Sequence, residues 1–229
     1  MSLLDNPLKD WDRCKVTMKE VYQIRPPKEY LINPIAPIAS LISIVGNSDS
    51  LKSMFTMVMG AATLTGKDFL PPEPGSSAIG TTFKTTKANV MWIDQDNGKI
   101  RTENRWQASA KAYNVPEDAG LEIYSFPLPT LNLSKDSHAT DLMLRIADSN
   151  TKLVVIDNLV TISGGVDENS AEIMKVMMNL RYIVENAQCA LFVIHHLRKS
   201  NGIRGLAGDN MRGFSGIKGA IDSLLVVSM

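Results

Sequence analysis

Short aliphatic runs alternate with longer stretches of helical periodicity along most of the chain. Short continuous aliphatic runs are typical of strands that are buried on both faces of a parallel sheet. We expect these strands at residues 40–45, 89–94, 121–126, 153–157 and 190–195, with a closing strand-like run at 220–227. The periodic stretches between them predict helices at residues 52–64, 101–113, 139–148 and 170–186. The alternation indicates an α/β fold, with a doubly wound, mainly parallel β-sheet and helices on both faces.

The first 27 residues have a different character from the rest. They are polar, include Trp11 and Tyr22, and end in Arg25-Pro26-Pro27. We expect an N-terminal extension with one short helix and a stiff linker at residues 1–27, followed by a single domain at 28–229. Within that domain, residues 71–80 are rich in Pro, Gly and Ser and predict a loop.

Composition narrows the classes of protein that are possible. The 229 residues suffice for one large buried core. The 24 basic and 24 acidic residues balance, so a nucleic-acid-binding surface would have to be a local patch. Cys14 and Cys189 provide neither a disulfide framework nor a zinc site. The N-terminus lacks the features of a signal peptide, and no apolar run approaches the roughly 20 residues that a bilayer requires. We therefore expect a soluble, cytoplasmic protein with no membrane contact.

The segment between the first predicted strand and the first predicted helix resembles a phosphate-binding loop. That pattern is Gly-x-x-x-x-Gly-Lys-Ser/Thr: its backbone N–H groups surround phosphates, its lysine neutralises them, and its hydroxyl holds Mg²⁺. Leu51 stands where the second glycine is expected, and Asp49 puts a carboxylate near the anion site. A strand-to-helix turn with a surface lysine would fit the same residues. The candidate nucleotide-binding residues are Gly46, Asn47, Ser48, Asp49, Ser50, Leu51, Lys52 and Ser53.

Two further strand ends carry carboxylates, and the ends of parallel strands meet at the edge where such sheets bind ligands. Asp157 follows four aliphatic residues and is predicted, with Ser53, to hold Mg²⁺, which prefers oxygen ligands. Asp96 follows the strand at 89–94 by two residues and is predicted to be the base that activates an attacking water. The alternatives are an aspartate that caps a loop and a solvated acidic turn.

The strand at 190–195 ends in His195-His196, and adjacent side chains on a strand point to opposite faces. We expect one buried histidine and one functional histidine rather than a metal pair. The following segment, 197–219, has six glycines and a net charge of +4, with Asp209 as its one acid. A flexible solvated loop would explain this segment, but its charge also suits salt-sensitive contact with a nucleic-acid backbone. Its cations are Arg198, Lys199, Arg204, Arg212 and Lys218.

Together these features resemble the RecA-type P-loop ATPase domain, and most closely the RepA/DnaB-like hexameric replicative helicase group. The resemblance covers roughly residues 28–227. Besides the loop and Asp157, it rests on five motifs: Ile93–Asp96, Arg105–Ala108, Asp167–Asn169, Ile194–Lys199 and Arg212–Ser215. It implies an ATP- and Mg²⁺-dependent hexameric ring that moves along single-stranded DNA, with a primase or other replication proteins as possible partners.

The resemblance also implies roles for particular residues. His196 would be the γ-phosphate sensor, and His195 its buried neighbour. Arg212 would reach the next subunit's nucleotide as an arginine finger, with Lys199 as a second candidate. Asp96 stands where the group more usually has glutamate, so its carboxylate is one methylene shorter. Leu51 brings either crowding of the phosphate or backbone strain. These departures leave open a non-hydrolysing nucleotide- or DNA-binding module with a degenerate loop, and a recombinase or regulator of the same fold.

Overall fold

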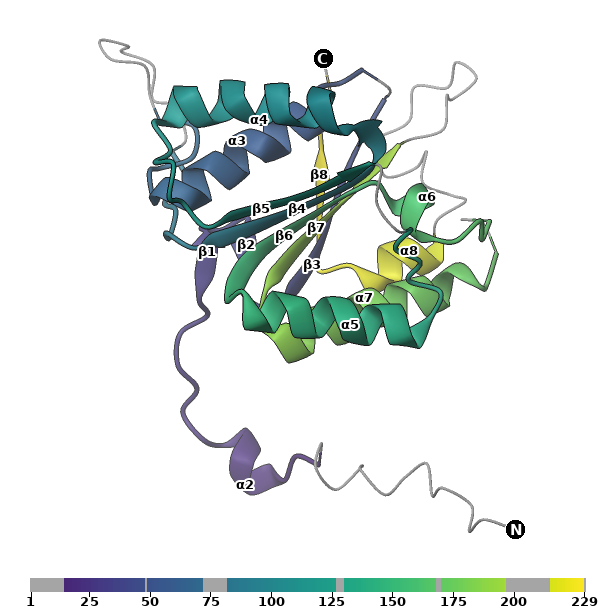
Figure 1. Cartoon of the computed structure of the whole chain (residues 1–229). Coiled ribbons are helices and arrows are strands. Elements are labelled where there is room, and N and C mark those ends of the chain that lie inside the picture. The colour runs from purple at the N-terminus through teal and green to yellow at the C-terminus, as the bar shows by residue number, and fades with distance from the viewer. Residues whose placement is uncertain are drawn as a thin grey trace.

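The computed structural model describes residues 15–47, 49–71, 82–126, 130–167, 170–196 and 215–228. Its centre is a six-stranded sheet in the order β5-β4-β6-β7-β3-β8, and every neighbouring pair is parallel. The predicted α/β fold with a parallel sheet is therefore confirmed (Figure 1). The strands are β3 (Ser40–Gly46), β4 (Asn89–Gly98), β5 (Leu121–Phe126), β6 (Thr151–Asp157), β7 (Ala190–His196) and β8 (Ser223–Val226).

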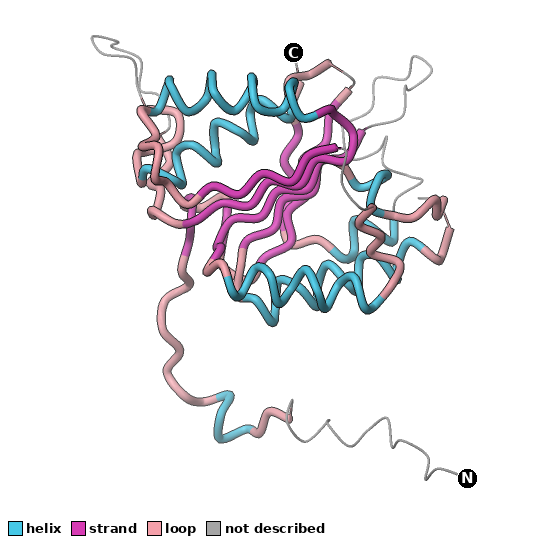
Figure 2. Tube along the Cα trace, viewed as in Figure 1, coloured by secondary structure: helices cyan, strands magenta, loops and turns pink. Residues whose placement is uncertain are grey.

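Helices cover both faces of the sheet, which form two separate hydrophobic cores (Figure 2). One face carries α3 (Lys52–Thr65) and α4 (Lys99–Tyr113). The other carries α5 (Asp136–Asp148), α6 (Leu159–Ile162), α7 (Ile173–Ala187) and α8 (Ser215–Ala220). In β3, Leu41 and Val45 belong to the core with α5 and α7, and Ile42 and Ile44 belong to the core with α3. Both sets are buried, which explains why the strand is continuously hydrophobic.

Several short elements were not predicted from the sequence. A small antiparallel pair, β1 (Tyr30–Ile32) and β2 (Ala36–Pro37), precedes the main sheet. Helix α6 has four residues and is capped by the side chain of Asn158, which accepts the N–H of Thr161. Helix α8 overlaps the end of the segment predicted to be a glycine-rich loop at 197–219, so that prediction was wrong for residues 215–219. Its last residue, Ala220, falls in the predicted strand-like run at 220–227. Elements this short contain too few residues to show a period.

Some boundaries also differ from the predictions, for local reasons. Strand β4 runs to Gly98 rather than residue 94, and its pairing with β5 shifts register after Asp94. Helix α7 begins at Ile173 rather than residue 170. The N–H groups of Ile173 and Met174 bond to the carbonyls three residues earlier, those of Ser170 and Ala171, so the residues before Ile173 form tighter turns. The predicted loop at 71–80 lies almost entirely outside the described residues.

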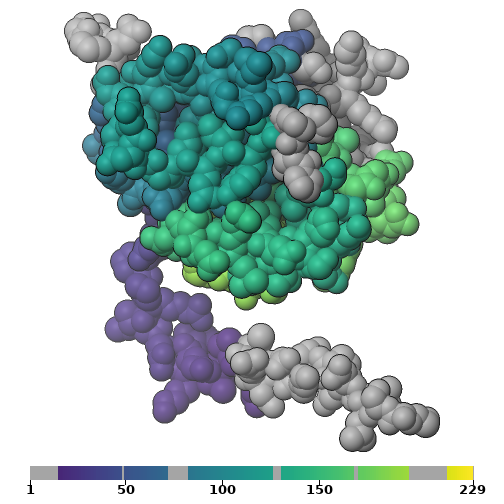
Figure 3. Space-filling model, in the orientation of Figure 1, coloured from purple at the N-terminus to yellow at the C-terminus, as the bar shows by residue number. Residues whose placement is uncertain are grey.

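The described N-terminal part, residues 15–27, stands apart from the body of the molecule (Figure 3). It contains the short helix α2 (Met18–Val21), and the side chains of Met18, Tyr22 and Ile24 are exposed. The division into an extension at 1–27 and a domain at 28–229 stays a prediction. Among the residues that the structure describes, no helix has both the length and the apolar character needed to cross a membrane.

Candidate functional site

The segment between β3 and α3 is a tight turn at the carboxyl edge of the sheet. Gly46 ends β3, and a Cβ on it would collide with the carbonyl oxygen of Val227 and the hydroxyl of Ser50. Only glycine fits there without displacing the backbone that follows β8. The hydroxyl of Ser50 donates to the carbonyl of Asn47 at 2.8 Å and so closes the turn. Ser48 lies outside the described residues.

Lys52 opens α3 and directs its ammonium into this turn. The side chain is only 4% exposed, and Nζ donates to the carbonyl oxygens of Gly46 at 3.1 Å and Asn47 at 2.6 Å, and to Ser50 Oγ at 3.3 Å. Burial lowers the pKa of Lys52, an effect opposed by the charges of Asp157 and Asp49. All three acceptors belong to the turn itself, so an anionic ligand in the turn can take their place.

Two residues of the turn have a left-handed backbone, which is unfavourable for residues with a Cβ. Asp49 has φ 64° and Leu51 has φ 59°. Leu51 occupies the position where the phosphate-binding pattern has glycine, so the expected strain is present. Leu51 is 59% exposed and lines the cleft at this turn, so the expected crowding of a phosphate stays a prediction.

Ser53 and Asp157 come together, although they are far apart in the sequence. The hydroxyl of Ser53, in the first turn of α3, donates to Asp157 Oδ2 at 2.6 Å. Asp157 ends β6 and is 2% exposed. Burial raises the pKa of Asp157 to about 6; the charges of Asp94 and Asp96 add to this, and the Ser53 hydrogen bond and the charge of Arg105 oppose it.

This pair fits Mg²⁺, which proteins bind through one or two oxygen ligands while water and phosphate supply the rest. Within the described residues there is no group of three His, Cys, Asp or Glu side chains that would instead suit a tightly coordinated metal ion. The two residues predicted to hold Mg²⁺ thus share one location with the right chemistry. Their role as ligands remains a proposal.

The acidic end of β4 divides into structural residues and one residue that faces the cleft. Asp94 is buried beside Asp157 in the sheet register, and it accepts hydrogen bonds from the backbone N–H groups of Asp96 and Asn97 and from the Thr102 hydroxyl. Gln95 bonds to the backbone of Leu131 and Thr161. Asp96 is exposed and lines the cleft, which leaves it as the predicted base.

These parts enclose a cleft of about 270 Å³ at the carboxyl edge. That is slightly below the roughly 300–1,000 Å³ of pockets that enclose a whole ligand, so it suits a phosphate chain rather than a complete nucleotide. Its lining residues are Asp49, Ser50, Leu51, Lys52, Ser53, Met54, Asp96, Asn97, Arg101, Arg105 and Asp157. Arg101 and Arg105 were not among the site residues predicted from the sequence, although Arg105 begins one of the motifs of the resemblance. Their spacing of four residues on one helix face, after the acidic strand end, was the available signal.

The remaining predicted site residues follow β7 or lie near the C-terminus. The backbone of His196 pairs with Gly46, so this strand end lies beside the turn, and His195 is buried as expected. Lys218 is exposed on α8. The side chain of His196 lies outside the described part of the structure, as do Arg198, Lys199, Arg204 and Arg212.

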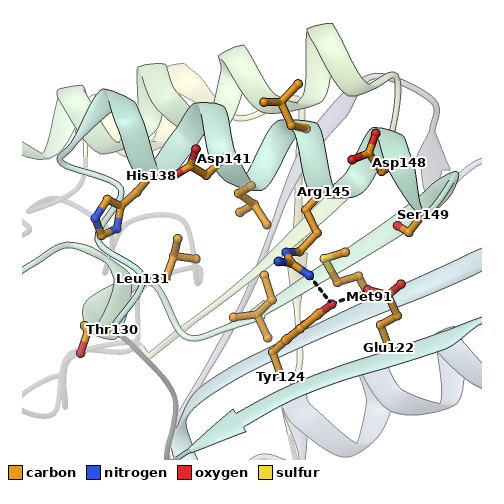
Figure 4. Close-up of a pocket in the computed structure, with 13 residues that line it drawn as sticks. Met91, Glu122, Tyr124, Thr130, Leu131, His138, Asp141, Arg145, Asp148 and Ser149 are labelled. Atoms are coloured by element: carbon orange, nitrogen blue, oxygen red, sulfur yellow. Dashed lines mark hydrogen bonds between the residues drawn. The ribbon is translucent and has the colours of Figure 1, made fainter.

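A second, larger cavity of about 1000 Å³ lies on the opposite face of the sheet, between β4, β5 and α5 (Figure 4). Met91 and Ile93 line its inner side. Arg145 projects from α5 toward Tyr124, whose hydroxyl accepts a hydrogen bond from its guanidinium at 3.2 Å. None of the described residues in its lining was predicted to be functional.

Comparison with protein families agrees with the fold and with the loop. Residues 9–202 match the model of an AAA domain, a P-loop ATPase family. No curated protein matches the chain. The match spans most of the sequence, and the parallel sheet with a lysine-containing turn after β3 is consistent with it. The chain therefore belongs to the AAA domain family.

Proposed function

We propose that this ATPase domain is the motor of a RepA/DnaB-like DNA helicase of the plasmid or phage replication type. It would couple hydrolysis of Mg²⁺-ATP to binding of single-stranded DNA. The observation that supports the proposal most is the hydrogen bond from the Ser53 hydroxyl to Asp157 Oδ2, at 2.6 Å. Buried Lys52 and exposed Asp96 line the same cleft. A metal-ligand pair, a phosphate-binding cation and a candidate base thus line one cleft, as phosphoryl transfer requires.

In this proposal each residue of the cleft has one task. Lys52 exchanges its contacts with the Gly46 and Asn47 carbonyls for the β- and γ-phosphates. Ser53 and Asp157 hold the metal ion, and Asp96 accepts a proton from the attacking water. Mg²⁺, when bound, would neutralise charge on the phosphate oxygens and orient them.

Coupling to DNA would run through the end of β7. The His196 backbone pairs with Gly46 of the turn, and His196 would respond to the γ-phosphate. The basic segment that follows, with Arg198, Lys199 and Arg204, would contact DNA together with Lys218. Arg212 would reach the nucleotide of a neighbouring subunit in a hexameric ring. A primase or another replication protein is the expected partner.

The test is Mg²⁺-dependent ATP hydrolysis by the full chain, with and without single-stranded DNA, at two salt concentrations. We expect hydrolysis that DNA stimulates and that salt weakens. Lys52→Ala should lower turnover by about 10²- to 10³-fold, because it removes a preorganised cation from the site of charge development. Lys111→Ala, an exposed lysine at the far end of α4, is the matched control and should leave turnover unchanged. Hydrolysis that persists in Lys52→Ala contradicts the assignment of the cleft.

One observation favours a second candidate, a nucleotide- or DNA-binding module that does not hydrolyse ATP. Asp49 and Leu51 both hold a left-handed backbone inside the turn, and Asp49 adds a negative charge where phosphate would bind. ATP binding without turnover, at any DNA concentration, would support this candidate over the motor.

A further inference from the structure

Helix α4 contributes two arginines to the lining of the cleft that also contains the phosphate-binding turn. Arg101 and Arg105 are four residues apart, so they lie on one face of the helix, and both line the cleft together with Lys52. Arg101 is exposed and Arg105 is half-buried. The cleft therefore has cations from two helices, one from α3 and two from α4.

The helix that carries these arginines is held firmly against its surroundings. Trp106, the residue after Arg105, is 2% exposed and packs edge-on against Trp92 of β4, with ring centroids 5.6 Å apart. Its ring also fills the space beside Gly60 of α3, where a Cβ would lie 2.6 Å from the indole. One turn earlier on the buried face of α4, the hydroxyl of Thr102 donates to buried Asp94 at 2.8 Å. The backbone that carries Arg101 and Arg105 is thus fixed relative to both β4 and α3.

The two arginines neutralise the negative charge that the other described residues give to the lining of the cleft. Among the described residues that line it, the carboxylates are Asp49, Asp96 and Asp157 and the cations are Lys52, Arg101 and Arg105, so their formal charges cancel. Without the two arginines the formal charge of the lining would be −2. Such a cleft would repel the negative charge of a polyphosphate, and the unusual carboxylate of Asp49 contributes half of that excess.

We propose that Arg101 and Arg105 form a phosphate-binding pair supplied by the same chain, which offsets Asp49 and binds the polyphosphate of a nucleoside triphosphate. This inference rests on the proposed function, since it assumes that the cleft receives a nucleotide. Arginine suits the role because its planar guanidinium donates two parallel hydrogen bonds to phosphate oxygens and never loses its charge. A single subunit then provides three cations to the phosphates before any neighbour contributes one.

The experiment compares binding of ATP and of inorganic tripolyphosphate to the full chain by calorimetric titration with Mg²⁺. The variants are Arg101→Gln, Arg105→Gln and their combination. Lys111→Gln serves as the control, because it removes one charge from the same helix outside the cleft. We expect each arginine substitution to weaken both probes about tenfold, and by the same factor, while the control changes neither. Adding Asp49→Asn to the arginine-deficient chain should recover about tenfold for both probes, because it removes one of the two excess negative charges.

Three results would overturn the inference. They are unchanged affinity in the arginine variants, weakened ATP with unchanged tripolyphosphate (which indicates contact with the base or sugar), and failure of Asp49→Asn to recover affinity. If the unaltered chain binds neither probe, the proposed function fails as well. The two failures are therefore distinguishable: binding by the unaltered chain that is insensitive to Arg101 and Arg105 rejects only the inference. Thermal unfolding of each variant without ligand verifies that it folds.

Discussion

Two cavities among the described residues, the one beside α5 and the cleft at the carboxyl edge, differ in size and in chemistry. The larger one, about 1000 Å³, lies between α5 and the outer strands β4 and β5, and it mixes apolar side chains with Glu122, Asp141 and Asp148. Among its described lining residues, Arg145 is exposed and its guanidinium donates a hydrogen bond to the Tyr124 hydroxyl. The smaller one, about 270 Å³, lies at the carboxyl edge of the sheet and receives charged groups from β4, β6, α3, α4 and the turn.

The difference shows that the candidate active site lies where several strands and helices bring charged side chains together, and not where the cavity volume is largest. At the carboxyl edge, parallel strands and the helices that follow them bring distant residues together, as with Ser53 and Asp157. Buried groups also hold the elements of this edge: Asp94 bonds to Thr102 of α4, and Trp106 of α4 packs against Trp92 of β4. The larger cavity arises where one helix covers two outer strands, and its acidic lining is unfavourable for a phosphate ligand.

Asp157→Asn should give the largest effects, with opposite signs for function and stability. We expect the variant to lose the Mg²⁺-dependent part of its ATP affinity, because a neutral amide binds Mg²⁺ weakly. Without ligand it should be more stable at about pH 7.5, by on the order of 2–3 kcal/mol, because the raised pKa means that ionised Asp157 destabilises the fold. Denaturant unfolding and titration with ATP, each with and without Mg²⁺, measure the two effects.

The pH dependence of that stability has a definite sign. The pKa of Asp157 is about 6 in the folded chain and near 3.8 without its surroundings. Between these values the folded state binds more protons, so the stability of the unaltered chain falls as pH rises from about 4 to 6. The gain from Asp157→Asn should therefore disappear by about pH 4. A gain that is equal at both ends of this range would contradict the proposed cause.

Gly60→Ala should damage the smaller cleft through packing alone. The added methyl would lie 2.6 Å from Trp106, so the indole and α4 must move. We expect a loss of about 1–3 kcal/mol in unfolding free energy, as for overpacked cores, together with weaker ATP binding. Gly219→Ala is the control, since a methyl there meets nothing within 4 Å and should leave ATP binding unchanged. Equal melting curves for Gly60→Ala and the unaltered chain would exclude the predicted clash.

Leu51→Gly should have a smaller effect, in the favourable direction. It removes the strain of a left-handed leucine whose side chain is largely exposed, so we expect about 1 kcal/mol of added stability, or a rise in Tm of roughly 2–4 °C. Leu70 has φ 51° and lies outside both cavities, so Leu70→Gly should raise Tm similarly. Only Leu51→Gly should also change ATP affinity. The same change in ATP affinity in both variants would contradict the prediction that Leu51 affects ATP binding through the cleft.

The sequence predicted the architecture because its main elements are long and strongly patterned. Strand β3 begins at Ser40 and helix α3 at Lys52, as expected from the aliphatic run and the periodicity after it. The spacing within residues 46–53 and the aspartate after the run at 153–156 likewise indicated which residues would meet. These signals are local, so no knowledge of the packed structure was needed to read them.

The rest depends on contacts that the sequence does not encode locally. The sequence does not show that Arg101 and Arg105 line the same cleft as Lys52. Their position depends on the packing of α4, in which Trp106 lies against Gly60 of α3. The acidic residues of β4 look alike in sequence, yet Asp94 is buried in a hydrogen-bond network while Asp96 faces the cleft. Such distinctions come from the packing of α3, α4 and β4 against each other.

The central claim is that the smaller cleft, and not the larger cavity, receives ATP. Its most direct test is a titration of the full chain with Mg²⁺-ATP, repeated with Lys52→Ala in the cleft and Arg145→Ala in the cavity. We predict saturable binding by the unaltered chain and by Arg145→Ala, and a loss of binding in Lys52→Ala. Binding that survives Lys52→Ala, or that is lost in Arg145→Ala while the variant stays folded, would contradict the claim.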